Sequence, residues 1–221
     1  MQKFLHLGGH YLREVSWLLC CIVIIKPMEE LLSKLKVTIA EKASNPNFIH
    51  HTWFIKWHLE IVETLSKDLK RFYPHANDDI LIALSWMHDY GKIMDLDNQY
   101  DHTYVEQGRL LMIELGFDAS FAMNIAESIK IFDKKDHLEN ASIEVRIVSS
   151  ADACSHLVGP WISLYWHENP DKPFEDIMKE NIRKLGTEWD LKVTLPEAIQ
   201  VYQRLHDDAM FHAEGEILRI G

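Results

Sequence analysis

Apolar residues recur every three or four positions along most of the chain, which is the spacing of an amphipathic α-helix. Residues 50–72 show the pattern most clearly, because one apolar stripe runs through them and includes Phe54, Ile55, Ile61, Val62 and Leu65. His58 lies in the middle of that stripe, and Pro74 follows the segment. We therefore expect one long helix that carries a histidine on its buried face.

The same periodicity predicts helices over the rest of the chain. The expected segments are residues 28–44, 78–87, 102–115, 118–132, 141–157, 161–166, 173–185 and 195–218. Asp118 is a suitable N-cap for one of them, and Gly116 is expected to end another. The alternation of apolar and polar residues that marks a strand never extends beyond a few positions. We predict an all-α fold, a single-domain helical bundle over residues 28–221.

Residues 1–27 differ from the rest of the chain. Residues 15–25 form an apolar run of eleven, shorter than the roughly 20 residues that a membrane-spanning helix needs. Lys3 and Arg13 precede the run, as in a signal peptide, but Lys26-Pro27-Met28 stands where a small-residue cleavage site belongs. We interpret residues 1–27 as an atypical extension, a misassigned start or a disordered segment, with a membrane anchor as the alternative. No stable membrane association is expected.

The composition is that of a soluble globular protein, with 47% hydrophobic and 26% charged residues in a chain of 221. A formal net charge of −11, without any basic stripe, argues against a nucleic-acid polymer as a partner. We expect instead a small phosphorylated substrate, whose charge a metal ion or a few lysines would offset. The three cysteines form no CxxC motif, which favours a reduced, cytoplasmic location. The sequence does not decide between a monomer and a homodimer.

A histidine and an aspartate meet at the end of the predicted helix over residues 78–87. His88 follows Leu84 by four positions, so it lies on the apolar face, and Asp89 comes next. Gly91 is expected to end the helix in a left-handed conformation. The pattern predicts a buried His–Asp pair, although a core histidine beside a helix-ending aspartate would show the same pattern.

Two further polar residues are expected on inward faces. His102 precedes Val105 by three positions at the start of its helix, and Asp152 shares one line with Val145 and Val148. An ionised carboxylate in an apolar stripe is costly unless it is paired or binds a cation. Asp152 is therefore expected to be either a metal ligand or the partner in a salt bridge.

Apolar faces converge when helices pack, so the polar side chains on these faces should converge as well. His58 and His88 would supply two imidazoles, and Asp89 and Asp152 two carboxylates. This mixed ligand set suits Mn²⁺, Fe²⁺, Co²⁺, Ni²⁺ or Zn²⁺, with Mg²⁺ as a further candidate. A divalent ion lowers the pKa of its bound water and polarises a phosphoryl oxygen. The residues thus indicate a metal-dependent hydrolase.

The ordered set of His58, His88-Asp89 followed by Gly91-Lys92, and Asp152 resembles the HD-domain metal-dependent phosphohydrolase superfamily over residues 50–157. The resemblance implies an all-α fold in which these histidines and aspartates bind the metal. It also implies cleavage of a phosphomonoester or phosphodiester, such as a nucleotide. A two-iron oxygenase of the HD type and a non-catalytic sensor domain are the alternatives.

Asp89, Lys92 and His102 are the expected catalytic residues. Lys92, just after the helix end, would neutralise a substrate phosphate, with an ordinary surface lysine as the alternative. His102 matches the first extra histidine of two-metal members, but Phe132-Asp133 stands where the second is expected. One metal ion is therefore favoured, and His102 would then either support a metal ligand or bind a phosphate, instead of binding the metal itself. The general acid stays open among three nearby acidic residues, Asp95, Asp97 and Asp101.

Overall fold

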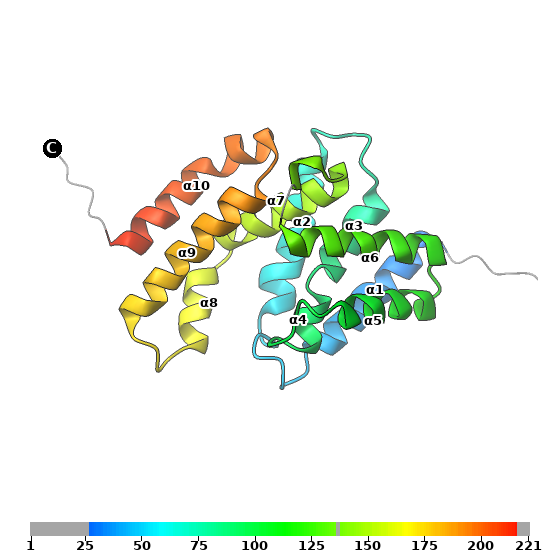
Figure 1. Ribbon diagram of the computed structural model, residues 1–221, viewed down its shortest axis with the longest axis horizontal. Helices are drawn as coiled ribbons and strands as arrows, with labels where there is room; N and C mark the ends of the chain where they lie inside the picture. Colours follow the sequence, from blue (N-terminus) through cyan, green and yellow to red (C-terminus); the bar gives the residue numbers. More distant parts are fainter. Residues whose placement is uncertain (1–26, 136–137, 216–221) are drawn as a thin grey trace, which may run out of the picture.

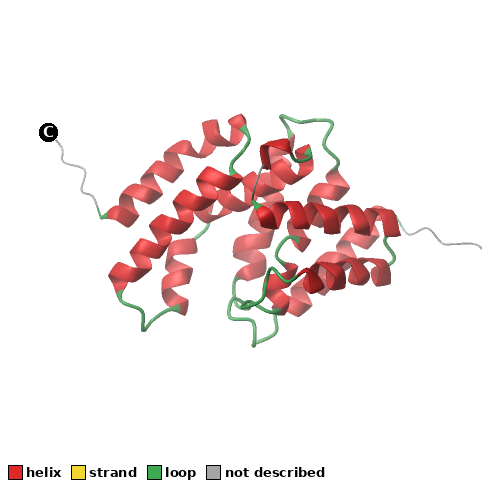
Figure 2. Cartoon of the chain, viewed as in Figure 1, coloured by secondary structure: helices red, strands yellow, loops and turns green. Residues whose placement is uncertain are grey.

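The computed structural model describes residues 27–135 and 138–215, and every regular element in these ranges is helical (Figure 2). The elements in chain order are α1 (Met28–Ala43), the π-helical turn η1 (Ile55–Leu59), α2 (Glu60–Lys70), α3 (Asp78–Met87), α4 (Tyr90–Met94), α5 (His102–Leu115), α6 (Ala119–Lys134), the short 3₁₀ turn η2 (Leu138–Asn140), α7 (Ile143–Val158), α8 (Trp161–Glu168), α9 (Phe174–Lys192) and α10 (Pro196–Glu214). The prediction of an all-α fold is confirmed. The extension over residues 1–27, apart from Pro27, lies outside the described residues.

Helix α7 lies in the middle of the molecule, between α1 to α6 on one side and α8 to α10 on the other (Figure 1). It packs against α2 and α3 in the first group and against α9 and α10 in the second. Its residues are accordingly buried around most of its circumference, as Val145, Ile147, Val148, Ala151 and Cys154 show. A side chain on α7 can therefore meet partners from both groups. None of the described helices is both long and apolar enough to cross a membrane.

The prediction of one continuous helix over residues 50–72 is wrong at its beginning. The chain runs through turns before Ile55–Leu59 forms a π-helical turn, and only then does α2 continue to Lys70. A π-turn holds an extra residue and changes which side chains face inward. Phe54, His58 and Leu59 are all buried as a result. The turn that carries the histidine is therefore irregular, and sequence periodicity alone does not show it.

Local capping residues explain several helix boundaries. The Asp118 carboxylate accepts hydrogen bonds from the backbone N–H groups of Ser120 and Phe121, as expected for an N-cap. Gly116 ends α5, as predicted, in a left-handed conformation with φ at 104°.

Gly91, in contrast, is no helix terminator, because it lies inside α4. A side chain there would collide with the backbone carbonyl of Gln99, so the close approach of the 95–101 loop requires glycine. The prediction that Gly91 ends a helix is therefore wrong, and glycine is needed at this position because the 95–101 loop packs against it.

Glu63 of α2 ties α1 and α3 to the bundle. Its carboxylate accepts hydrogen bonds from Lys36 at 2.6 Å, Lys67 at 2.5 Å and the indole N–H of Trp86 at 2.5 Å. Burial on its own raises the pKa of Glu63, but these three donors lower the pKa below its usual value of 4.5. The charged form is thus favoured in the folded state.

We expect Glu63→Gln to lower the free energy of unfolding by about 1–3 kcal/mol near neutral pH, because it weakens hydrogen bonds to a buried N–H and two lysines. A carboxyl group whose pKa is lowered by folding contributes stability above its unfolded pKa and loses it as the pH falls. The difference between wild type and variant should therefore shrink below pH 4.5. Urea unfolding at neutral and acidic pH measures it, with the exposed Glu60→Gln as control. A difference that does not change with pH would contradict this account.

Candidate metal centre

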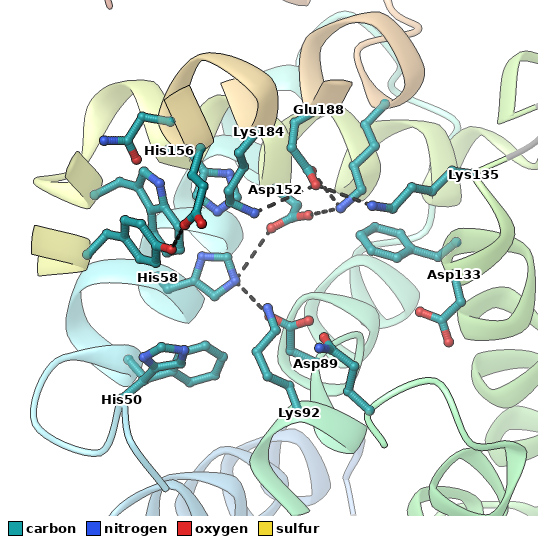
Figure 3. A pocket seen from close by; sticks show the side chains of 18 of the residues that line it. His50, His58, Asp89, Lys92, Asp133, Lys135, Asp152, His156, Lys184 and Glu188 are labelled. Carbon is teal, nitrogen blue, oxygen red and sulfur yellow. Dashed lines mark hydrogen bonds and ion pairs between the residues drawn. The ribbon is translucent and has the colours of Figure 1, made fainter. Parts of the chain in front are cut away.

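Three of the expected ligands come together in one buried cluster. His58 comes from η1, His88 directly follows α3, and Asp152 lies in the middle of α7. One ligand atom from each of the three lies within 4.8 Å of the others, and all three side chains are buried. Figure 3 shows the His58 imidazole between the carboxylates of Asp152 and Asp89. The helices thus converge as their apolar stripes predict.

The second nitrogen of each histidine is held by a hydrogen bond that orients the ring. The Nδ1 of His88 lies 3.0 Å from the backbone carbonyl of Ser85, to which it donates. The Nδ1 of His58 lies 3.2 Å from the hydroxyl oxygen of Ser155, and that hydroxyl donates to the Asp152 carbonyl. Both rings therefore direct Nε2 into the cluster, which is the arrangement found for metal-binding histidines.

The cluster fits a divalent cation. Within the described ranges, the buried Nε2 of His88 has no hydrogen-bond partner, and the nearest carboxylate oxygens, from Asp89 and Asp152, are both 3.5 Å away. Buried polar atoms are seldom left unpaired in folded proteins. Two imidazoles and a carboxylate also match the ligand preference of Mn²⁺, Fe²⁺, Co²⁺, Ni²⁺ and Zn²⁺.

Asp89 lies beside these three residues and contacts both His58 and Lys92. Its Oδ2 lies 3.0 Å from the Nε2 of His58 and 2.5 Å from the ammonium group of Lys92. Asp89 is not in the group whose ligand atoms all lie within 4.8 Å. Lys92 lines the same pocket, as a phosphate-binding cation should. The roles of Asp89 as ligand and of Lys92 as catalytic group remain predictions.

The two interpretations of Asp152 turn out to be compatible, because its two oxygens face different partners. Oδ1 lies 3.4 Å from the Nε2 of His58, whereas Oδ2 forms a 2.6 Å salt bridge with Lys192 of α9. Lys192 is itself buried and also contacts Glu188 at 2.8 Å. The salt bridge leaves Oδ1 directed at the histidines, so Lys192 orients the proposed ligand.

The electrostatic field in the cluster favours positive charge. Burial lowers the pKa of His88, but the carboxylates of Asp89 and Asp152 outweigh that effect and raise it to about 10. Burial raises the pKa of both aspartates, yet neighbouring cations hold each well below its usual value: Lys92 and His88 act on Asp89, and Lys192 and His88 on Asp152. The two carboxylates therefore stay ionised, and together they stabilise positive charge in the cluster.

His102 does not join the cluster. It is the first residue of α5, its side chain is exposed, and it does not line the pocket. The expectation that it faces inward is wrong, because the first turn of α5 is exposed and Val105 is the first residue of this helix that is buried. Near the place of the second extra histidine, the Phe132 ring packs against His88 with ring centroids 5.2 Å apart.

The proposed source of the general acid also changes. None of the three acids considered from the sequence, Asp95, Asp97 and Asp101, lines the pocket of the cluster, whereas Asp133 of α6 does. Burial and the charge of Asp89 raise the pKa of Asp133 to about 6. Asp133 thus combines the right location with a carboxyl group that holds its proton more readily than usual.

Sequence reasoning missed the contribution of α9 altogether. Lys184, Glu188 and Lys192 lie at steps of four on this helix and line the pocket. The repeated charged positions are visible in the sequence, but nothing local connects them with Asp152, which lies 40 residues away from Lys192. Only the packing of α9 on α7 shows the connection.

Two curated proteins are similar to part of this chain, and both are named 3'-5' exoribonuclease YhaM. The protein from Shouchella clausii is 29% identical over 114 residues, which cover 51% of this chain and 33% of that protein. The protein from Oceanobacillus iheyensis is 33% identical over 64 residues, which cover 28% of this chain and 20% of that protein. The chain thus matches a third or less of the length of these relatives. No protein-family model and no solved structure matches it.

These relatives correct one prediction. The net charge of −11 predicts a small phosphorylated substrate and excludes a nucleic-acid polymer, and the similarity to two exoribonucleases contradicts both statements. Total charge describes the whole surface, whereas a nucleic-acid backbone is bound by a local group of cations. Four lysines and one arginine line the pocket here beside five acidic residues, so the pocket does not share the strongly acidic balance of the whole chain. Over about half of its length, this chain is similar to an enzyme named for degrading RNA from its 3' end.

Proposed function

We propose that this protein is a metal-dependent phosphodiesterase that hydrolyses RNA from its 3' end. The observation that carries the proposal is the buried cluster of His58, His88 and Asp152, whose ligand atoms lie within 4.8 Å of one another. The similarity to the exoribonucleases supports RNA as the substrate, and the lysines that line the pocket supply charges to hold its phosphates. A two-iron oxygenase or a sensor domain has no comparable support.

His58, His88, Asp89 and Asp152 would hold the metal ion, which supplies a Lewis acid and an activated water when bound. Lys92, next to Asp89, contributes a positive charge to the scissile phosphate, and the Lys192 salt bridge keeps Asp152 in place. Asp133 is the acid available to protonate the leaving oxygen, because its pKa is raised and it lines the same pocket. Figure 3 shows it on the side of the pocket opposite His58.

The proposal predicts metal-dependent shortening of RNA. A 5'-labelled oligoribonucleotide should lose nucleotides one at a time from its 3' end with Mn²⁺ or Co²⁺, and stay intact with chelator. Elemental analysis should find about one transition-metal ion per chain, the number that one His-His-Asp cluster holds. The same oligonucleotide with a blocked 3' end is the control. Metal-loaded protein that leaves the unblocked RNA intact would overturn the proposal.

A further inference from the structure

The pocket of the metal cluster continues into a second part, lined by α7, α8 and α9. His156 of α7, Trp161 of α8, and Asn181 and Lys184 of α9 line it together with His58. The ring centroids of His156 and His58 are 5.6 Å apart, so the second part directly adjoins the cluster. The cavity has a volume of about 280 Å³. One bound molecule could therefore reach both parts.

The second part contains three polar atoms that lack partners. Among the described residues, the buried Nδ2 of Asn181, Nδ1 of His156 and Nε1 of Trp161 have no hydrogen-bond partner. Asn181 is 1% exposed and His156 is 7% exposed. Buried polar groups are nearly always hydrogen-bonded, so three such atoms on residues that line one pocket indicate a ligand that supplies the missing partners.

Lys184 adds a positive charge beside these atoms. Its ammonium group lies 4.8 Å from the centroid of the Trp161 ring, and its ion pair with Glu188 is long, at 3.7 Å. Glu188 also contacts Lys192 at 2.8 Å and Lys135 at 3.4 Å. One carboxylate thus faces three lysines. Lys184 is the one held least closely, which leaves its charge available to a ligand.

The chemistry of these groups selects an anion. An indole N–H and an ammonium group only donate hydrogen bonds, and the free Asn181 atom is an amide nitrogen, so the ligand must present several acceptors. A phosphate does so and also carries the charge that Lys184 balances, whereas a nucleobase is neutral and offers donors as well. In RNA degraded from its 3' end, the neighbouring phosphate lies on the 5' side of the scissile bond.

We propose that His156, Trp161, Asn181 and Lys184 form a second phosphate subsite, which binds the phosphate 5' to the one at the metal cluster. The inference rests on the proposed function and adds to it a requirement for two adjacent phosphates. An RNA dinucleotide has this second phosphate only when its 5' end is phosphorylated. The subsite therefore predicts a difference between two substrates that share the same scissile bond.

The experiment compares a dinucleotide that has a 5'-phosphate with one that has a 5'-hydroxyl. The wild type should show a KM about tenfold or more lower for the phosphorylated substrate, the effect of one charged hydrogen-bonded contact. Lys184→Gln and Trp161→Phe should bring the ratio of the two KM values close to one, and Lys184→Arg should preserve it. Calorimetric binding of both dinucleotides in chelator gives a readout that is independent of turnover.

Lys179→Gln is the matched control, because Lys179 is an exposed lysine on the same helix that pairs with Asp176 and does not line the pocket. It should keep the wild-type ratio. Equal KM values for the two dinucleotides in the wild type would overturn the subsite and leave the proposed function standing. Cleavage of neither dinucleotide, together with intact longer RNA, would overturn both.

Discussion

Asp152→Ala is expected to remove metal-dependent RNA hydrolysis and most of the stabilisation that metal provides. With Mn²⁺ at about 100 times its Kd, the wild type should gain about 2.7 kcal/mol in the free energy of unfolding. The variant lacks the oxygen that faces His58 and His88, so its gain should be close to zero. Thermal melting with chelator and with Mn²⁺ measures both values.

The salt bridge to Lys192 sets what should happen without metal. Asp152→Ala removes one of two carboxylates that contact Lys192, and Glu188 remains 2.8 Å away. We therefore expect a modest loss of stability in chelator instead of unfolding. Asp208→Ala, at an exposed position on α10, is the control and should keep the full metal effect. An Asp152→Ala protein that is stabilised by Mn²⁺ as much as the wild type would rule out Asp152 as a ligand.

Lys192→Met should have the opposite effect to Asp152→Ala: a large loss of stability without metal, and a metal-induced stabilisation that is retained. It leaves the buried carboxylates of Asp152 and Glu188 without their shared cation, so the free energy of unfolding in chelator should fall by about 3–5 kcal/mol. Mn²⁺ supplies positive charge next to Asp152, and the variant should therefore retain its metal-induced stabilisation. Chemical unfolding with and without Mn²⁺ distinguishes it from Asp152→Ala.

Two further variants test the cause of that loss. Adding Glu188→Gln to Lys192→Met removes one of the two carboxylates that lost their shared cation and should recover part of the stability. Lys179→Met, the same change at an exposed position of α9, should have little effect. If Lys192→Met is as stable as the wild type in chelator, the salt bridge does not hold Asp152 in place.

The helices and their inward polar residues were predictable because both depend on local spacing. Asp118 caps α6 and Gly116 ends α5 through contacts within a few residues, and the sequence shows such contacts directly. His58, His88 and Asp152 lie on apolar stripes, and apolar stripes meet when helices pack. The prediction that these residues meet needed no knowledge of the packing angles.

The errors arose where local spacing or total composition does not describe the surroundings of a residue. Gly91 fits a helix terminator by sequence, but the nearby backbone of Gln99 is what requires glycine there. His102 has the spacing of an inward residue, yet its position in the first turn of α5 leaves it exposed. The charge of the whole chain was a poor guide to the pocket, because five basic and five acidic side chains line it, a balance that the total of −11 does not reflect.

The sequence by itself thus determined an all-helical protein and which residues could form a metal cluster, because helical periodicity and ligand chemistry are properties of short segments. The tertiary structure alone decided what surrounds that cluster. The π-turn determines which way His58 faces. The packing of α9 on α7 brings Lys192 to Asp152, and a contact of α9 with the start of α8 brings Lys184 to Trp161. The partners of these charges are 23 to 40 residues away along the chain. Contacts over such separations depend on how whole helices pack, which no local pattern specifies.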